Sequence, residues 1–379
     1  MIYLDNAATT YPKPDCVMRS VKNSMKKYGA NPGRSGYKMA VETAERIYYS
    51  REAVRRFFNA ESAENIIFTQ NCTAALNICI KSLAKNGKNI ICSSLEHNAV
   101  MRPLEKLRCD GLCEYKIAQI DDDDNITVKN INNLIDVNTV AVVITAASNV
   151  TGAVTPVKKI SAVCKKHKIP LVVDAAQAAG IIPLDCKELG IDYLCVAAHK
   201  GLYAPVGIGI LVINSDIVPE SIIQGGTGSN SLSFSQPDFL PDRLESGTVN
   251  TSGIIAVKDS VDFVERIGID KIYSHEYSLL IYLEDELKNM KNVTVYSSLD
   301  GNKASAPVLS FNINGFHSEQ VAYSLAEKDI CVRAGYHCSF LAHKSLDTLE
   351  SGTVRISPSI YTKKRDIYFT INCIYKLQN

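Results

Sequence analysis

The stretch "IPLVVDAAQAAGIIPLDCKELGIDYLCVAAHKG" (residues 169–201) decides the fold of this chain. It contains two short apolar runs, 169–176 and 193–198, separated by a segment with turn residues. Runs of this length, rich in valine and leucine, are typical of strands buried on both faces of a parallel sheet. The two runs therefore predict two strands of an α/β domain.

The same alternation continues outward in both directions. Amphipathic stretches at 73–87 and 156–168 have helical spacing, and the second starts with a proline. Further apolar runs of strand length occur at 65–69, 89–94, 139–148 and 208–214. Because strands that alternate with helices form largely parallel sheets, residues 15–255 are predicted to form one large α/β domain.

The pattern changes after "SGTVNTSG" (246–253). A long helical stretch is predicted at about 254–290, followed by the shorter strands and helices of an α+β unit. We expect residues 256–379, together with residues 1–14, to form a smaller second domain, which the long helix joins to the first.

The composition excludes some classes of function. The 379 residues are 46% hydrophobic, and 41 Lys and Arg nearly balance 40 Asp and Glu. A chain this neutral has no electrostatic preference for nucleic acid. The N-terminus has no signal-peptide pattern and no run of about 18 apolar residues occurs, so we expect a cytoplasmic protein with no membrane partner. The acidic run 121–124 is interpreted as a solvated turn.

Twelve cysteines are scattered at irregular spacings without a C-x-x-C pair. A chain of this size does not need disulfides for its stability, so most of these thiols are predicted to be reduced and buried, and no metal site is predicted. Taken alone, Cys338 is also interpreted as a reduced, buried thiol.

Polar residues follow several of the predicted strands, and ligands of open α/β sheets bind beyond the carboxyl ends of strands. Thr73 lies where a strand passes into a helix, so free N–H groups favour a phosphate there, with simple N-capping as the alternative. His97 and Asn149 follow two other strands, and each taken alone is an ordinary polar or turn residue.

Asp174 and Lys200 are more informative. Asp174 ends a β-branched run, and a carboxylate at that depth needs a cationic or N–H partner. Lys200 follows the next strand, so burial would make it a nucleophilic amine unless the side chain reaches solvent. With an anion-binding helix start and a flat histidine, the pair matches the needs of pyridoxal 5′-phosphate: a Schiff-base lysine, an acid for the pyridine nitrogen and a phosphate site.

A set of motifs, ordered along nearly the whole chain, resembles those of class V aminotransferase-fold cysteine desulfurases and selenocysteine lyases. They are "YLDNAATT" (3–10), "EHNA" (96–99), "SNVTG" (148–152), "VDAAQAAG" (173–180), "AAHKGLYAPVGIG" (197–209), "RLESGTVNTSGI" (243–254), and "RAGYHC" (333–338) with "GTVRIS" (352–357). The resemblance implies fold type I of the pyridoxal-phosphate enzymes, with a mostly parallel seven-stranded sheet, and a homodimer with shared active sites.

The resemblance also implies the cofactor contacts. Lys200 would bind the cofactor covalently, Asp174 would pair with its pyridine nitrogen, and Gln177 would hydrogen-bond the ring 3′-oxygen. His97 would stack on the ring. The remaining contacts, mostly to the phosphate, are implied for Cys72, Thr73, His199, Asn149 and, from the neighbouring subunit, Thr227 in "GGTGS" (225–229).

Asn149 and Arg355 match the residues that hold the substrate carboxylate, for which a guanidinium is well suited. Asn6 and Ala7 of the first motif are implied to line the substrate side of the site. Cys338 matches the nucleophile that accepts sulfur. The resemblance thus gives this cysteine, among twelve, a functional interpretation.

The implied reaction converts L-cysteine to L-alanine. Lys200 would move the Cα proton, Cys338 would become a persulfide, and His97 would assist at the cofactor ring. Four residues are candidates to stabilise the Cys338 thiolate, and the sequence does not rank them: His97, Arg333, His337 and His343. The sulfur acceptor stays open among an iron–sulfur scaffold, a tRNA-thiolation protein, a selenium pathway and a small thiol.

The chain departs from the family pattern at two positions and in one stretch. Ala197 stands where many relatives have a phosphate-binding serine, and Tyr336 replaces the first histidine of "HHC". The stretch 339–355 after the nucleophile is relatively long. These departures affect substrate choice more than fold or cofactor.

Three other functions compete with desulfuration. A selenocysteine lyase has the same scaffold and would act on L-selenocysteine. Transamination, epimerisation or kynurenine cleavage would leave Cys338 a structural thiol. A binding or scaffold protein that has lost catalysis is disfavoured by the presence of both Lys200 and Asp174.

Overall fold

A seven-stranded sheet forms the centre of the computed structural model, which describes residues 1–33, 35–299 and 304–378. The strand order is β2-β8-β7-β6-β5-β3-β4, and β8 alone runs antiparallel to its two neighbours. The strands are β2 (Ile66–Thr69), β3 (Asn89–Ser93), β4 (Glu114–Ala118), β5 (Thr139–Thr145), β6 (Leu171–Asp174), β7 (Tyr193–Ala197) and β8 (Gly209–Ile213). The predicted mostly parallel sheet and fold type I are confirmed.

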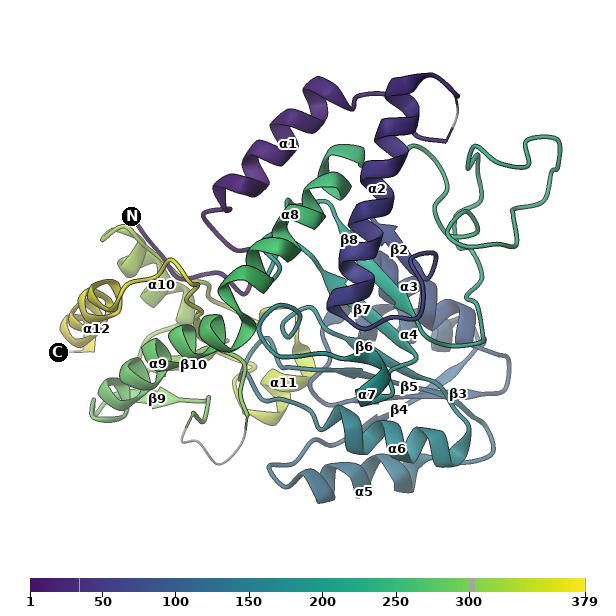
Figure 1. The fold of residues 1–379 in the computed structure, drawn as a ribbon. Coiled ribbons are helices and arrows are strands. Elements are labelled where there is room, and N and C mark those ends of the chain that lie inside the picture. The colour runs from purple at the N-terminus through teal and green to yellow at the C-terminus, as the bar shows by residue number, and fades with distance from the viewer. Residues whose placement is uncertain (34, 300–303, 379) are drawn as a thin grey trace.

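Alternate side chains of each central strand enter two different cores. Leu171 and Val173 of β6 belong to the core that also contains residues of α2, α6 and α8, whereas Val172 belongs to the core under α3 and α4. Both faces of the sheet are therefore covered, as its continuous apolar runs require. The covering helices (Figure 1) are α2 (Lys38–Phe57), α3 (Cys72–Leu83), α4 (Asn98–Cys109), α5 (Asp124–Leu134), α6 (Val157–His167), α7 (Cys186–Leu189) and α8 (Thr251–Ile267), and α1 (Asp15–Lys27) packs against α8.

Two sequence expectations need correction. The predicted helix at 254–290 is two helices, α8 and α9 (Ile269–Lys288), because Gly268 has a φ of 93° and breaks the helix between them. Strand β4 was not predicted, since it lies at the sheet edge and its sequence EYKIA alternates polar with apolar residues. Asp123, within the acidic run, caps α5 by accepting from Asn125 N.

The C-terminal part forms a smaller unit with its own apolar core (Figure 1). Here β1 (Ile2–Tyr3) pairs in parallel with β11 (Ile330–Cys331), so the first residues of the chain join the last third. The other elements are β9 (Val293–Val295), β10 (Leu309–Ile313), β12 (Val354–Ile356), α10 (Ser318–Ala326), α11 (Phe340–Ser345) and α12 (Lys364–Gln378). The domain boundaries given above stay a prediction.

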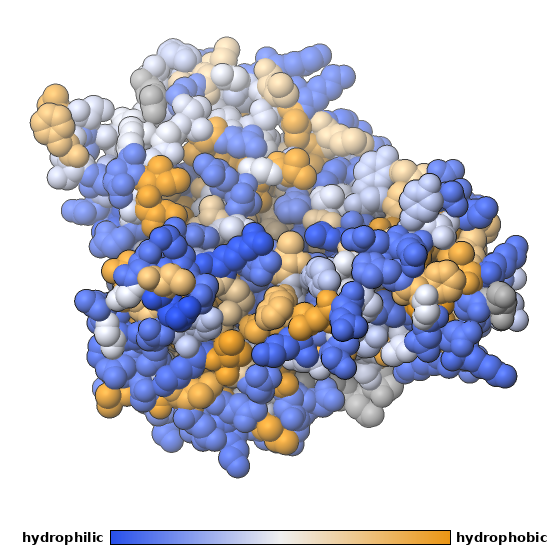
Figure 2. All heavy atoms as spheres, turned by 180° about the vertical axis from the view of Figure 1, so that it is seen from behind, coloured by the Kyte–Doolittle hydropathy of each residue, from blue (hydrophilic) through white to orange (hydrophobic). Residues whose placement is uncertain are grey.

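Hydrophilic residues cover most of the face opposite to that of Figure 1, with apolar ones scattered among them in small groups (Figure 2). Within the described residues, no helix is both long and apolar enough to span a membrane.

Candidate active site

A cavity of about 240 Å³ lies beyond the carboxyl ends of the parallel strands. It is the place where β3, β5, β6 and β7 deliver the polar residues that follow them. Of the residues predicted for the site, the cavity is lined by Ala7, Cys72, Thr73, His97, Asn149, Asp174, Gln177, His199, Lys200, Cys338 and Arg355.

Asp174 ends strand β6, and Lys200 follows the neighbouring strand β7, as predicted. The Asp174 side chain is 3% exposed, and its Oδ1 accepts from Ala176 N at 2.9 Å and from Cys72 Sγ at 3.5 Å. Burial lowers the pKa of Lys200 to about 8, helped by the positive charge of Arg355 and opposed by Asp174. The pKa of this amine therefore lies close to neutral pH, which suits proton transfer and nucleophilic attack.

The peptide that precedes Lys200 is fixed by the N-terminal segment. The carbonyl oxygen of His199 accepts from Lys13 Nζ at 2.6 Å, from Thr10 Oγ1 at 3.1 Å and from Thr9 Oγ1 at 3.2 Å. Burial lowers the pKa of Lys13 to about 8. Sequence reasoning missed Lys13, although it follows the motif "YLDNAATT" by only a few residues.

The start of α3 and His199 can hold an anion. Asn71 Oδ1 caps the helix by accepting from Ala74 N at 2.9 Å, and Thr73 lies in the first turn, where N–H groups have no intrahelical partner. His199 Nδ1 is buried without a hydrogen-bond partner. Capping, one of the two alternatives that the sequence left open, is thus observed at this helix start, and the N–H groups beside Thr73 stay available for an anion.

His97 ends the turn after β3 and caps α4. Its Nδ1 accepts from Ala99 N at 3.0 Å, which assigns the ring proton to Nε2. Burial lowers the pKa of His97, so the ring is neutral and offers a flat surface to the cavity. Beneath it, the fully buried Glu96 accepts from Ser93 Oγ and Thr145 N, and burial raises its pKa to about 8.

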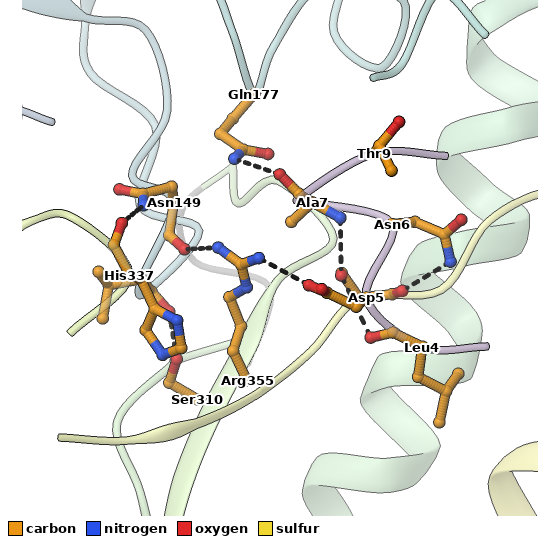
Figure 3. A network of polar contacts seen from close by, with 12 residues as sticks. Leu4, Asp5, Asn6, Ala7, Thr9, Asn149, Gln177, Ser310, His337 and Arg355 are labelled. Atoms are coloured by element: carbon orange, nitrogen blue, oxygen red, sulfur yellow. Dashed lines mark hydrogen bonds and ion pairs between the residues drawn. The ribbon is translucent and has the colours of Figure 1, made fainter. Parts of the chain in front are cut away.

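Arg355 lies at the centre of a polar network (Figure 3). Its guanidinium is 1% exposed; Nη1 donates to Asn149 O and Nη2 to Asp5 Oδ1, both at 2.9 Å. These two bonds use two of the five N–H donors of the guanidinium, and Nε is buried without a hydrogen-bond partner. Sequence reasoning missed Asp5, although it is the carboxylate of the first motif.

Asn149 holds the nucleophile loop on both sides of Cys338. Its Nδ2 donates to His337 O at 2.7 Å, and its Oδ1 accepts from Ser339 Oγ at 2.6 Å. Asn98 N, at the start of α4, donates to Cys338 O at 2.7 Å. His337 and Cys338 both have positive φ, 49° and 59°, so these bonds keep a strained backbone in place.

The Cys338 side chain is exposed, and three of the four candidate thiolate partners line the same cavity. His97 and Arg333 line the same cavity as Cys338. His337 lines this cavity too, but its Nε2 bonds to Thr353 and burial lowers the pKa of His337 to about 2. His343 is buried and does not line the cavity. The geometry thus favours His97 and Arg333 over the two buried histidines.

Two predicted residues do not line this cavity. Asn6 uses its amide for the backbone: Nδ2 donates to Ser357 O at 3.0 Å, and Oδ1 accepts from Tyr11 N at 3.1 Å. Thr227 lies in a different cavity, within the loop that precedes α8. Its side chain bonds to Ser229 Oγ at 3.1 Å.

The cavity contains a buried acid, a lysine and a helix start that can hold an anion, on an α/β sheet covered on both faces. These features define a class of enzyme, and comparison with known proteins tests whether the chain belongs to it. The family model "Aminotransferase class-V" matches residues 2–368. Members of this family generally use pyridoxal phosphate.

The relatives narrow the class. A protein named probable cysteine desulfurase of Borreliella burgdorferi is 33% identical, over 97% of this chain and 89% of its own. The apo structure of the cysteine desulfurase from Thermococcus onnurineus superposes with a TM-score of 0.90 at 29% identity, covering 99% of this chain and 94% of that one. The structure of the Escherichia coli cysteine desulfurase CsdA superposes with a TM-score of 0.88 at 26% identity, covering 99% of this chain and 94% of that one. The chain therefore belongs to the class V aminotransferases and, within them, to the cysteine desulfurase family.

Proposed function

We propose that this protein is a pyridoxal 5′-phosphate-dependent cysteine desulfurase that converts L-cysteine to L-alanine and accepts the sulfur on Cys338. The observation that carries the proposal is the presence of an exposed thiol, Cys338, in one cavity with Lys200, Asp174 and Arg355. The named relatives agree with this reaction.

The side chains present fit the cofactor. Asp174 offers an acceptor for a protonated pyridine nitrogen, and His97 offers a flat neutral ring. The unpaired His199 Nδ1 and the first turn of α3 offer partners for a phosphate. When bound, the cofactor supplies an electron sink for the negative charge that develops at the substrate Cα.

Lys200 would hold the cofactor and then move the Cα proton. With its pKa lowered to about 8, the freed Nζ is a base near neutral pH. The guanidinium of Arg355, which lines the cavity and uses two of its five donors on Asn149 O and Asp5 Oδ1, would donate to the substrate carboxylate. This contact would orient the Cα proton toward Lys200 and the sulfur toward Cys338.

The Cys338 thiolate would then attack the substrate sulfur. A sulfur–sulfur bond forms as the Cβ–sulfur bond breaks, and the carbon keeps the electron pair and gains a proton to become the methyl group of alanine. Arg333, the permanent cation in this cavity besides Arg355, favours the thiolate, and His97 Nε2–H offers it a hydrogen bond.

The active site would be completed by a second copy of the chain. Thr227 lies outside the cavity of its own subunit, in a loop that also exposes Leu232 and Phe234 fully. A homodimer that exchanges these loops would bring Thr227 of one subunit to the phosphate site of the other and cover the exposed apolar side chains.

Alanine release from L-cysteine and from L-selenocysteine tests the proposal. We expect the cofactor-loaded wild type to release alanine from L-cysteine, and Cys338→Ala to lose at least about 100-fold in this rate, because no other thiol of the described residues lies exposed in the cavity. Lys200→Ala should lack the cofactor absorbance of the wild type. Activity on L-selenocysteine alone, or an unimpaired Cys338→Ala, would refute desulfuration and favour one of the alternatives.

A further inference from the structure

A surface groove of about 330 Å³ opens beside Cys338, between α3 and α4. Four residues line both this groove and the active-site cavity: Thr73, His97, Ala99 and Cys338. Cys338 therefore stands where the two meet, and a sulfur atom on its exposed thiol can be reached from the groove.

The groove is positively charged. Lys81, Arg102 and Lys106 line it, and no Asp or Glu does. Lys106 pairs with Asp110 at 2.6 Å, whereas no carboxylate in the described part of the chain lies within ion-pair distance of Lys81 or Arg102. This concentration of cations contrasts with the net charge of +1 of the whole chain. The groove is therefore built for an anionic partner.

The length of the groove indicates a peptide rather than a small ion. Its walls run from Thr73 to Lys81 along α3 and from Asn98 to Lys106 along α4. At a rise of about 1.5 Å per residue, each wall is about 12 Å long. An extended peptide advances about 3.3 Å per residue, so about four residues fit along the cations.

We propose that this groove docks an acidic, extended segment of a sulfur-acceptor protein and thereby brings the acceptor's thiol to Cys338. The inference rests on the proposed function, because it requires a persulfide on Cys338. The acceptor thiolate attacks the outer sulfur, a new sulfur–sulfur bond forms, and the bond to Cys338 Sγ breaks. Cys338 leaves as a thiolate and the outer sulfur departs on the acceptor, so no external oxidant or reductant is needed.

Short peptides test the docking site on the intact, cofactor-loaded enzyme. The probes are a cysteine followed by four glutamates, the same peptide with glutamines and the same peptide with lysines. We expect persulfide transfer, measured by mass spectrometry, to be at least about 10-fold faster to the acidic peptide than to the glutamine peptide, with a difference that shrinks as salt rises. The lysine peptide should be slowest.

The double variant Lys81→Gln with Arg102→Gln should transfer to the acidic and the glutamine peptide at equal rates. The matched control is Lys129→Gln, which removes an exposed lysine of α5 and should transfer like the wild type. Alanine release with dithiothreitol as acceptor does not need the groove and should be unchanged in both variants.

The outcomes separate the two proposals. If the wild type releases no alanine with dithiothreitol, the desulfurase function itself fails. If it does, but the acidic and glutamine peptides react equally, the docking site is overturned. A double variant that keeps its preference for the acidic peptide, or that loses alanine release with dithiothreitol, overturns it as well.

Discussion

At the scale of single residues, Asn149 links the substrate site to the nucleophile. Both polar atoms of its side-chain amide bind the residues that flank Cys338, and its main-chain carbonyl oxygen accepts from Arg355 Nη1. The resemblance to the family implies a role for Asn149 in binding cofactor and substrate. The contacts add that it positions the strained backbone of Cys338.

Asn149→Ala should release the Cys338 loop. The change removes two buried hydrogen bonds, each worth about 1 kcal/mol net, so amides of residues 336–342 should exchange with deuterium faster and alanine release should fall by at least about 10-fold. Asn289→Ala, which removes an exposed side chain that donates to Asp285 O at the end of α9, is the control and should change neither. Unchanged exchange in Asn149→Ala would show that other contacts position Cys338.

At the scale of elements, the loop before Cys338 is held to the start of β12 by the contact of Gly335 with Gly352 and Thr353, which we call the latch. Gly335 and Thr353 exchange two backbone hydrogen bonds, both of 3.1 Å. Gly352 has a φ of 60°, and a Cβ there would lie 2.7 Å from Gly335 Cα, so only glycine allows the two segments this approach. The stretch 339–355 is longer than the family pattern predicts, and α11 and this latch accommodate the additional length.

Gly352→Ala should displace the latch and with it Cys338. Gly87→Ala is the matched control, because Gly87 has a similar φ of 71° but nothing within 4 Å of an added Cβ. In both variants the left-handed conformation of the alanine should lower the free energy of unfolding by about 1 kcal/mol. In Gly352→Ala the steric clash should lower it further and remove most of the alanine release. Equal melting temperatures and activities of the two variants would contradict the steric argument.

At the scale of the whole molecule, the N-terminal segment and α9 join the smaller unit to the large sheet around Lys200. Residues 9–13 fix the His199 carbonyl, and Glu276 of α9 accepts from Tyr203 Oη at 3.2 Å. Glu276 is 1% exposed, and burial raises its pKa to about 8. The folded protein therefore holds a proton on Glu276 that the unfolded chain releases above about pH 4.5.

Glu276→Gln should make stability less dependent on pH. Because the folded pKa is raised, the contribution of Glu276 is fully present below about pH 4.5 and is lost as pH rises toward about 8. Between pH 5 and pH 8 the free energy of unfolding of the wild type should fall by on the order of a few kcal/mol more than that of Glu276→Gln. Denaturant unfolding at several pH values measures this, with the exposed Glu286→Gln as control. Parallel curves for wild type and Glu276→Gln would show that Glu276 is ionised when folded.

The sequence by itself determined six of the seven strands of the sheet and the residues at their ends, because apolar runs, turns and motif positions are local properties. On this basis it predicted Asp174 and Lys200, and the resemblance of its motifs to the family added His97 and Cys338. Only the tertiary structure decided which residues meet across long separations: Asp5 with Arg355, Lys13 with His199, and Cys338 with the basic groove between α3 and α4. The physical reason is that a buried ion pair, an orphaned donor or a groove depends on distances between elements, which spacing along the chain does not contain.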